Sequence, residues 1–363
     1  MSLVNVDVLV IGLGPAGGRA AAVAARAGLS VLAVEKKRQL GVPVQCAEFV
    51  PLPMSRLASS EPVRVQTISG MKSFLPSGEV DQTAFPGLMI NRDEFDAAIA
   101  RDAQAVGAQI WLQSRLQTLD AARRVATIVT PEGEQQVHYK LLVAADGPHS
   151  AVARQLGLAE LQTVNTRQYS VDLLQPFTDT DIWLSDDFPG GYGWLFPKGN
   201  KANLGMGSDK RFGEDLKTPL DRLHRVLIES GRVGATIHGR TGGSIPVGGL
   251  RQSLVVGDVM FVGDAGGFTH PITGAGISAA VLSGEAAGQA AVDYLQGDRD
   301  ALQDYQDEMR DQYQDTLQRA VNRRKELLTV WHTPAAQRDD VMRRGWIAFD
   351  EYFFEPQQQA VAV

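Results

Sequence analysis

The sequence contains little cysteine and histidine, and it has no long apolar run. Cys46 is the only cysteine among 363 residues, which excludes a disulfide within the chain. The six histidines show no close His–His or Cys–His spacing of the kind that binds zinc, so no structural metal is expected. No apolar run reaches the ~20 residues that a helix needs to span a bilayer. The first residues also lack the basic region and cleavage site of a signal peptide.

The composition narrows the class of protein further. A formal net charge of −7 argues against general nucleic-acid binding. With 44% hydrophobic and 21% charged residues, the chain can form a globular protein with a large core and two lobes. These features predict a cytoplasmic protein. Contact with a membrane surface stays open, because peripheral binding needs no spanning segment.

The N-terminal segment has the pattern of a dinucleotide-binding β-α-β unit. Val6–Ile11 is a β-branched and leucine-rich run typical of a strand buried on both faces, and a G-x-G-x-x-G loop at residues 12–17 follows it. The expected helix runs to about Ala27, and a second strand, Leu29–Val34, ends at Glu35. An acidic residue at about this distance binds ribose hydroxyls. The unit predicts a bound dinucleotide without distinguishing NAD from FAD.

The remaining segments predict a discontinuous α/β domain with an inserted sheet. Asn91–Ala108 has the pattern of a capped helix, and Gly274–Leu295 that of a long helix. Lys140–Gly147 and Leu254–Gly263 are apolar runs typical of buried parallel strands. Short alternating segments with glycine and proline at 165–210 indicate an antiparallel sheet.

The expected fold is therefore a Rossmann-like α/β nucleotide-binding domain with an inserted antiparallel β-sheet domain and a C-terminal helical segment. The first domain is expected over 1–60, 90–160 and 250–297, the second over 61–89 and 161–249, and the helical region over 298–363. Asp298–Thr329 is highly charged. A solvated helix with an apolar stripe packed inward is favoured there over a membrane-surface or partner helix.

A second strand–turn–helix pattern distinguishes the two cofactors. The stretch FVGDAGGFTHPITGAGI, Phe261–Ile277, lies some 250 residues after the glycine loop and is not part of an ordinary NAD domain. The glycine loop with Glu35, NRDEFD, AADG and GDAGG…GAGI stand in an order that resembles flavoproteins of the p-hydroxybenzoate hydroxylase fold. The resemblance implies that the cofactor is FAD.

Two further segments narrow the resemblance. Pro189–Pro197 fits P-x-x-Y-x-W-x-F-P, and Pro43–Phe49 is similar to P-V-x-C-G-E-G; both patterns resemble those of geranylgeranyl reductases, which saturate isoprenoid double bonds. Halogenases of the superfamily carry W-x-W-x-I-P, which this chain lacks. It departs from the geranylgeranyl reductase pattern at Ala47 and Phe49, where the family has glycine. At His270, archaeal members often carry aspartate or asparagine.

The resemblance, together with the spacing of the motifs, assigns the expected FAD contacts. Glycines permit the tight turn and the close approach of the pyrophosphate, and Arg92 at a helix start is disfavoured by the helix dipole unless it has another role. N–H groups at the start of the last helix can stabilise negative charge on the reduced ring. The residues expected to contact FAD are Gly12, Gly14, Ala16, Gly17, Glu35, Lys36, Cys46, Ala47, Arg92, Leu116, Asp146, Asp264, Gly276 and Ile277.

The expected substrate residues are aromatic. Tyr192, Trp194 and Phe196 alternate, so they point to one face of a strand; such a stripe is commonly core, but the family pattern favours the wall of a long apolar cavity. Cys46, Tyr192 and Trp194 are the catalytic candidates, with Tyr192 and Cys46 as possible proton donors. A lone cysteine is also commonly just a small buried side chain.

The resemblance implies an FAD-dependent oxidoreductase that transfers hydride to a carbon–carbon double bond of an isoprenoid chain. The alternatives are a monooxygenase that hydroxylates an aromatic or polyketide substrate, and a flavin-binding protein without turnover. No second G-x-G-x-x-G is present, so no separate NADPH domain is evident. The electron donor stays open between NAD(P)H and ferredoxin, and an electron-transfer partner is possible.

Overall fold

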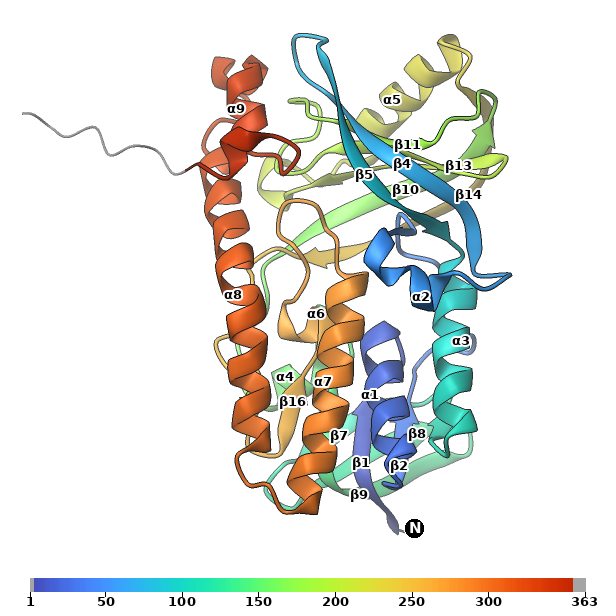
Figure 1. The fold of residues 1–363 in the computed structure, drawn as a ribbon, viewed down its shortest axis with the longest axis vertical. Coiled ribbons are helices and arrows are strands. Elements are labelled where there is room, and N and C mark those ends of the chain that lie inside the picture. Colours follow the sequence, from blue (N-terminus) through green and yellow to red (C-terminus); the bar gives the residue numbers. More distant parts are fainter. Residues whose placement is uncertain (1–2, 355–363) are drawn as a thin grey trace, which may run out of the picture.

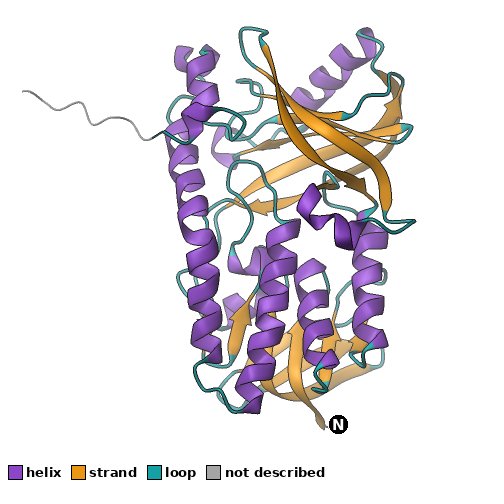
Figure 2. Ribbon diagram, viewed as in Figure 1, coloured by secondary structure: helices purple, strands orange, loops and turns teal. Residues whose placement is uncertain are grey.

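The computed structural model describes residues 3–354. Figure 1 shows an elongated molecule with a mainly parallel sheet near the N-terminus at one end and a second sheet at the other. In this view α1 (Pro15–Arg26), α3 (Arg92–Ala105) and α7 (Ile277–Gln296) stand side by side over the first sheet, and α8 (Ala301–Leu328) runs along the side of both halves. In Figure 2 the two sheets appear as separate blocks of strands with helices between and beside them.

The first sheet has a parallel core with antiparallel additions. Its order is β15 (Val255–Val256), β16 (Val259–Phe261), β9 (Gly133–Ala144), β1 (Leu3–Ile11), β2 (Val31–Val34) and β6 (Gln109–Trp111), with β8 (Val125–Thr130) on β9 and β7 (Arg115–Asp120) on β8. The strands from β16 to β6 run parallel, whereas β15, β8 and β7 pair antiparallel. Buried valines and leucines cover both faces of β1, as the apolar run predicted.

The second sheet is almost wholly antiparallel. Its order is β14 (Val233–Pro246), β10 (Thr163–Leu173), β13 (Lys201–Ser208), β12 (Gly193–Lys198), β11 (Asp179–Trp183), β4 (Arg64–Phe74), β5 (Val80–Ile90) and β3 (Phe49–Pro51), and only β11 and β4 pair in parallel. One face packs on α5 (Lys217–Glu229). The other face packs on Ala47, on Ile272 and on residues of the C-terminal region such as Trp331 and Trp346.

Close helix packing depends on small residues. Glycines of α7 (Ile277–Gln296) face α1 (Pro15–Arg26), and a Cβ on Gly284 would lie 2.1 Å from the carbonyl oxygen of Ala16. The remaining helical segments are α2 (Ser55–Ala58), α3 (Arg92–Ala105), α4 (Ala151–Gln155), α6 (Gly263–Gly266), α8 (Ala301–Leu328), α9 (Asp339–Arg344), η1 (Leu52–Met54), η2 (Lys210–Phe212), η3 (Pro334–Gln337) and η4 (Asp350–Tyr352).

The predicted fold class is confirmed, with one local error. Leu254–Gly263 was expected as a single parallel strand, but a turn at Gly257, with a φ of +59°, splits it into β15 and β16. The division into domains stays a proposal; within it, β3 falls in the range 1–60 yet pairs with β5 of the second sheet. The helix expected over Asp298–Thr329 is α8, which buries its apolar side chains.

No helix within residues 3–354 is long and apolar enough to cross a membrane. Residues beyond 354, the last part of the predicted region 298–363, lie outside the described residues.

Candidate active site

The glycine loop between β1 and α1 leaves main-chain groups free. Gly12 has a φ of +96°, and a Cβ there would lie 2.3 Å from the carbonyl oxygen of Ala145. A Cβ on Gly17 would lie 1.9 Å from the Gly12 oxygen, whereas one on Gly14 would meet no atom within 4 Å. Gly14 precedes α1 without a side-chain cap. The first turn of α1 therefore presents unpaired N–H groups to open space beside Gly14.

Glu35 lies beside the same loop. Its Oε2 accepts a hydrogen bond of 3.0 Å from the N–H of Leu13, and its Oε1 accepts one of 2.9 Å from the N–H of Lys37. The carboxylate thus fixes the loop from the end of β2, while Lys36 is exposed.

Asp146 follows β9 and organises the next turn. Its Oδ2 accepts hydrogen bonds from the N–H groups of Ala151 and Val152 at the start of α4, at 2.7 and 3.1 Å. Its buried Oδ1 has no partner within the described residues, and burial raises the pKa of this carboxyl group. Leu116 on β7 lies in the core cluster under the first sheet.

Asp264 and the start of α7 lie together. Asp264 Oδ1 accepts a hydrogen bond of 2.5 Å from the hydroxyl of Thr269, and burial raises the pKa of Asp264. Gly276 precedes α7 without a side-chain cap, and Ile277 is the first helical residue. Gly263 approaches α1 closely, since a Cβ on it would lie 3.0 Å from Cβ of Ala16. The starts of α1, α6 and α7 therefore converge.

These groups fit FAD. FAD contains a pyrophosphate and several hydroxyl groups. The two uncapped helix starts and the open space at Gly14 suit the pyrophosphate, and the unpartnered Oδ1 of Asp146 can accept a hydrogen bond from a hydroxyl group. The individual contacts of these residues with FAD stay predictions.

The loop that carries Cys46 and Ala47 is held by the second sheet. The side-chain amide of Gln168 donates to the Cys46 carbonyl oxygen at 3.0 Å, and that of Asn203 donates to the Ala47 carbonyl oxygen at 3.1 Å. The Cys46 Sγ accepts from the N–H of Glu48 at 3.2 Å. Loss of solvation raises the pKa of the Cys46 thiol, although the charge of Arg92 acts in the opposite direction.

Glu48 is the residue that sequence reasoning did not assign to the site. It is 3% exposed and has a φ of +70°, which is unusual for a residue with a side chain. Its carboxylate lies 2.6 Å from Nζ of Lys198 and 2.9 Å from Nδ2 of Asn203, and it accepts from the N–H of Arg92 at 3.0 Å. The available signal was its place beside Cys46 in PVQCAEF.

Arg92 begins α3, as predicted. Its guanidinium forms two hydrogen bonds of 3.0 Å with the carboxylate of Asp96, one turn later. This pair explains why a cation is tolerated at a helix start. Arg92 also lies close enough to Cys46 and Asp264 to influence both pKa values.

The three aromatic residues share one apolar cluster, although Tyr192 lies one residue before β12. The hydroxyl of Tyr192 donates to the Thr273 carbonyl oxygen at 2.5 Å, and the indole N–H of Trp194 donates to Oε1 of Gln168 at 3.1 Å. Because Gln168 also binds the Cys46 carbonyl, this wall is connected to both loops expected at the flavin. Phe196 contacts Phe49 edge to face at 6.3 Å between ring centres.

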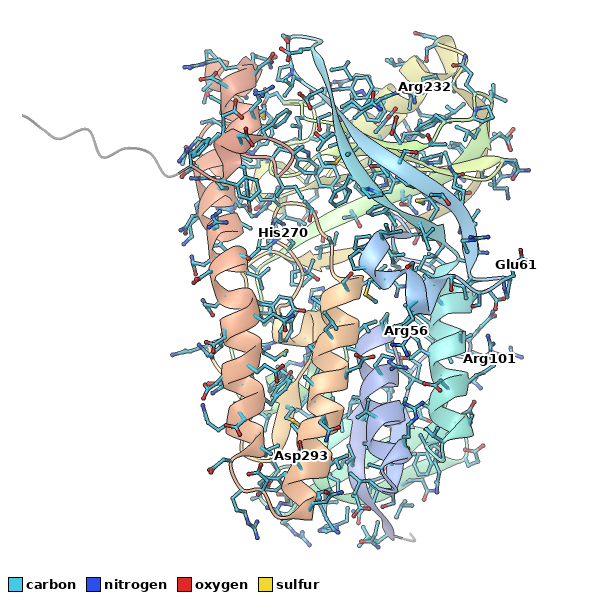
Figure 3. The ribbon with its side chains drawn as sticks, in the orientation of Figure 1. Arg56, Glu61, Arg101, Arg232, His270 and Asp293 are labelled. Carbon is cyan, nitrogen blue, oxygen red and sulfur yellow. The ribbon has the colours of Figure 1, made fainter. Side chains whose placement is uncertain are left out.

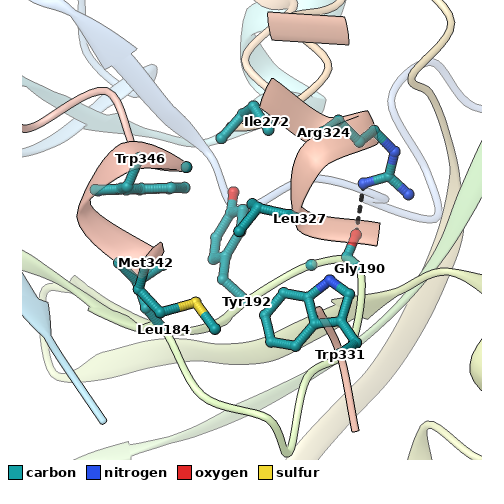
Figure 4. Close-up of a pocket in the computed structure, with 11 residues that line it drawn as sticks. Leu184, Gly190, Tyr192, Ile272, Arg324, Leu327, Trp331, Met342 and Trp346 are labelled. Carbon is teal, nitrogen blue, oxygen red and sulfur yellow. Dashed lines mark hydrogen bonds between the residues drawn. The ribbon is translucent and has the colours of Figure 1, made fainter. Parts of the chain in front are cut away.

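Residues of the C-terminal region cover the wall formed by Tyr192, Trp194 and Phe196. No sequence motif predicted this cover. Figure 4 shows the Tyr192 ring between the indoles of Trp346 and Trp331, with Leu327 and Met342 beside it. The rings of Tyr192 and Trp346 lie 4.9 Å apart between centres. The cavity between them measures about 20 Å³, enough for one water molecule.

His270 lies where the loop before α7 meets this cover. Its Nδ1 accepts from the N–H of Thr273 at 3.2 Å, and its Nε2 lies 3.4 Å from the hydroxyl of Tyr352 in η4. Burial lowers the pKa of His270 to about 4. The ring is therefore neutral near pH 7.

Comparisons with known proteins agree with this geometry. Residues 7–48 and 61–200 each match a family model described as an FAD binding domain. The protein is thus an FAD-binding flavoprotein, and the predicted cofactor is confirmed.

The relatives define the particular family. Digeranylgeranylglycerophospholipid reductase 1 of Methanopyrus kandleri is 34% identical over 334 residues, which cover 86% of this chain and 88% of the relative. The digeranylgeranylglycerophospholipid reductase of Methanosarcina acetivorans is 34% identical over 319 residues, which cover 80% of this chain and 75% of the relative. A geranylgeranyl bacteriochlorophyll reductase-like structure from Thermoplasma acidophilum superposes with a TM-score of 0.86 at 26% identity, covering 95% and 92%. The chain belongs to the digeranylgeranylglycerophospholipid reductase family, and it is an FAD-dependent oxidoreductase.

Proposed function

We propose that this protein reduces carbon–carbon double bonds of an isoprenoid chain in a lipid. The observation that carries the proposal is the aromatic wall of Tyr192, Trp194 and Phe196 and its connection to both flavin-side loops. Tyr192 binds the loop before α7, and Trp194 reaches the Cys46 loop through Gln168. Because the cavity at this wall has room for only one water molecule, a bound isoprenoid chain requires the C-terminal cover to move outward. An apolar chain lying along the wall would then be beside the expected position of the flavin ring.

Bound FAD, once reduced, supplies the hydride for such a reaction. An isolated double bond has no carbonyl to accept developing charge, so the protein contributes geometry and water exclusion. Trp331 and Trp346 close the side of the wall that faces away from the second sheet. The aromatic rings then hold the double bond in one orientation.

A proton must reach the second carbon, and two groups are proposed for this step. Burial raises the pKa of the Tyr192 phenol, and loss of solvation raises that of the Cys46 thiol, so both carry their protons at neutral pH. His270 is not proposed, because its low pKa leaves it without an acidic proton to donate near pH 7.

We also propose that the protein is cytoplasmic and contacts a membrane surface peripherally, because its proposed substrate is a lipid. The electron donor is proposed to be NAD(P)H or ferredoxin, and ferredoxin would require a docking partner.

The test is anaerobic reoxidation of the reduced holoenzyme by a geranylgeranyl lipid, followed by flavin absorbance. Wild-type protein is expected to reoxidise with formation of the saturated lipid, and Tyr192→Phe to do so at least ten-fold more slowly. A wild-type rate in Tyr192→Phe removes tyrosine from the mechanism and leaves Cys46. Product that forms only with oxygen, and contains oxygen, would instead establish the monooxygenase alternative.

A further inference from the structure

A groove opens between α1, the η1–α2 segment and α7, away from the cavity beside Tyr192. It has a volume of about 540 Å³, and its lining includes Arg19, Arg26, Arg56, Leu57, Leu282 and Glu285. We name it the arginine groove. In Figure 3, Arg56 is labelled on α2, above α1 and beside α3.

The arginine groove is locally basic in an acidic protein. Arg19 lies 3.0 Å from Asp102 and 2.7 Å from Glu285, and Arg26 lies 2.9 Å from Asp102. Arg56 is exposed, and within residues 3–354 it forms no ion pair or hydrogen bond. The lining thus carries three guanidinium groups and the carboxylate of Glu285. Counting also Asp102, which pairs with Arg19 and Arg26, the local charge is about +1 where the whole chain carries −7.

Two exposed leucines flank these charges. Leu52 in η1 is 48% exposed and Leu282 on α7 is 40% exposed. An unpaired arginine beside projecting leucines is complementary to a phospholipid surface, where phosphates lie above acyl carbons.

We propose that the arginine groove docks the protein on an anionic phospholipid membrane. Arg56 contacts headgroup phosphates, and Leu52 and Leu282 insert among the upper acyl carbons. Leu52 follows the Cys46 loop through β3, and Leu282 lies five residues after Ile277. Docking here brings the two flavin-side loops near the lipid. This extends the proposed reduction of a lipid but requires no turnover.

The test is co-sedimentation of the FAD-loaded protein with vesicles of saturated-chain lipids. Vesicles of phosphatidylcholine with phosphatidylglycerol are expected to bind the protein, less strongly as salt is raised, and pure phosphatidylcholine vesicles to bind it weakly. Arg56→Gln is expected to reduce partitioning about five-fold, and Leu52→Ser or Leu282→Ser about three-fold each.

Matched controls exist elsewhere on the surface. The side chain of Arg123 is exposed and has no ion pair within the described residues, and Leu174 is 57% exposed. Arg123→Gln and Leu174→Ser are expected to bind vesicles like the wild type. Equal binding by Arg56→Gln and wild type, equal loss in the controls, or no preference for anionic vesicles would overturn the proposal.

A second measurement separates this proposal from the proposed function. Reduction of a detergent-dispersed geranylgeranyl lipid is expected to be unchanged in Arg56→Gln, because Arg56 is not part of the aromatic wall. A loss of that activity would assign the groove to the substrate headgroup and contradict membrane docking. Intact vesicle binding by a protein that reduces no lipid would contradict the proposed function alone.

Discussion

The two halves of the molecule contribute different groups to the candidate active site. The parallel-sheet half contributes mainly main chain: the uncapped starts of α1 and α7, at Gly14 and Gly276. The antiparallel half contributes side chains, with the aromatic wall and the amides of Gln168 and Asn203. The parallel-sheet half suits the polar groups of the cofactor, because the N–H groups at a helix start can bind them whatever the side chains are. The antiparallel half suits the apolar chain proposed as substrate, because only side chains can form an apolar surface.

This difference predicts different responses to mutation. A main-chain site depends on glycines at fixed positions, so even one methyl group is costly. A side-chain site tolerates changes of shape, but a buried charge there depends on its partner.

Gly17→Ala is expected to have the largest effect. The new Cβ would lie 1.9 Å from the Gly12 oxygen, a main-chain atom that cannot move without displacing β1. We expect a loss of about 3 kcal/mol in the free energy of unfolding of the apoprotein, together with loss of FAD. Urea unfolding and the ratio of flavin to protein absorbance measure the two effects.

Gly14→Ala is the matched control for this prediction. Its Cβ would meet no protein atom within 4 Å, so the apoprotein should unfold like the wild type while FAD binding weakens. Equal destabilisation of the apoprotein by both substitutions would show that the close approach of Gly17 to the Gly12 oxygen is not the cause of the loss.

Glu48→Gln is expected to have the next largest effect. The amide cannot balance the ammonium group of Lys198, whose side chain is 20% exposed, and its NH₂ group would face Nδ2 of Asn203. We expect a loss of about 2–3 kcal/mol in the free energy of unfolding, discounted for the partial exposure of Lys198.

The double variant Glu48→Gln with Lys198→Met provides the control. Removing the unpaired cation should recover more than half of the loss measured for Glu48→Gln alone. If the loss in the double variant instead equals the sum of the losses in Glu48→Gln and Lys198→Met, the two side chains do not depend on each other. In that case the buried pair is not what holds the Cys46 loop.

The same contrast explains what the sequence predicted. The β-α-β unit with its glycine loop, the start of α3 at Arg92 and the alternation of Tyr192, Trp194 and Phe196 are local patterns, so they could be predicted from spacing. Glu48 and Lys198 are 150 residues apart. Trp331 and Trp346 lie in irregular segments with no period. Contacts made only by folding leave no local pattern, so the charge pair and the C-terminal cover required the structure.

His270 lies where the loop before α7 meets the C-terminal region. Its titration is expected to have the smallest effect on the free energy of unfolding. Burial lowers its pKa to about 4 in the folded state, against about 6.5 when unfolded. The unfolded chain therefore binds more protons between these values. The stability that neutral His270 contributes is complete above pH 6.5 and decreases as the pH falls toward 4. This contribution should be about 2 kcal/mol smaller at pH 5 than at pH 7.

The measurement is urea unfolding of the wild type and of His270→Asn at pH 7 and pH 5. Asparagine keeps a polar side chain but cannot titrate, so the difference between the two proteins removes the contribution of every other ionisable group. We expect the wild type to lose about 2 kcal/mol more than His270→Asn on acidification. An equal loss in both proteins would mean that His270 accepts a proton in the folded state. The contact with Tyr352 would then not exclude water from the interface between the loop before α7 and the C-terminal cover.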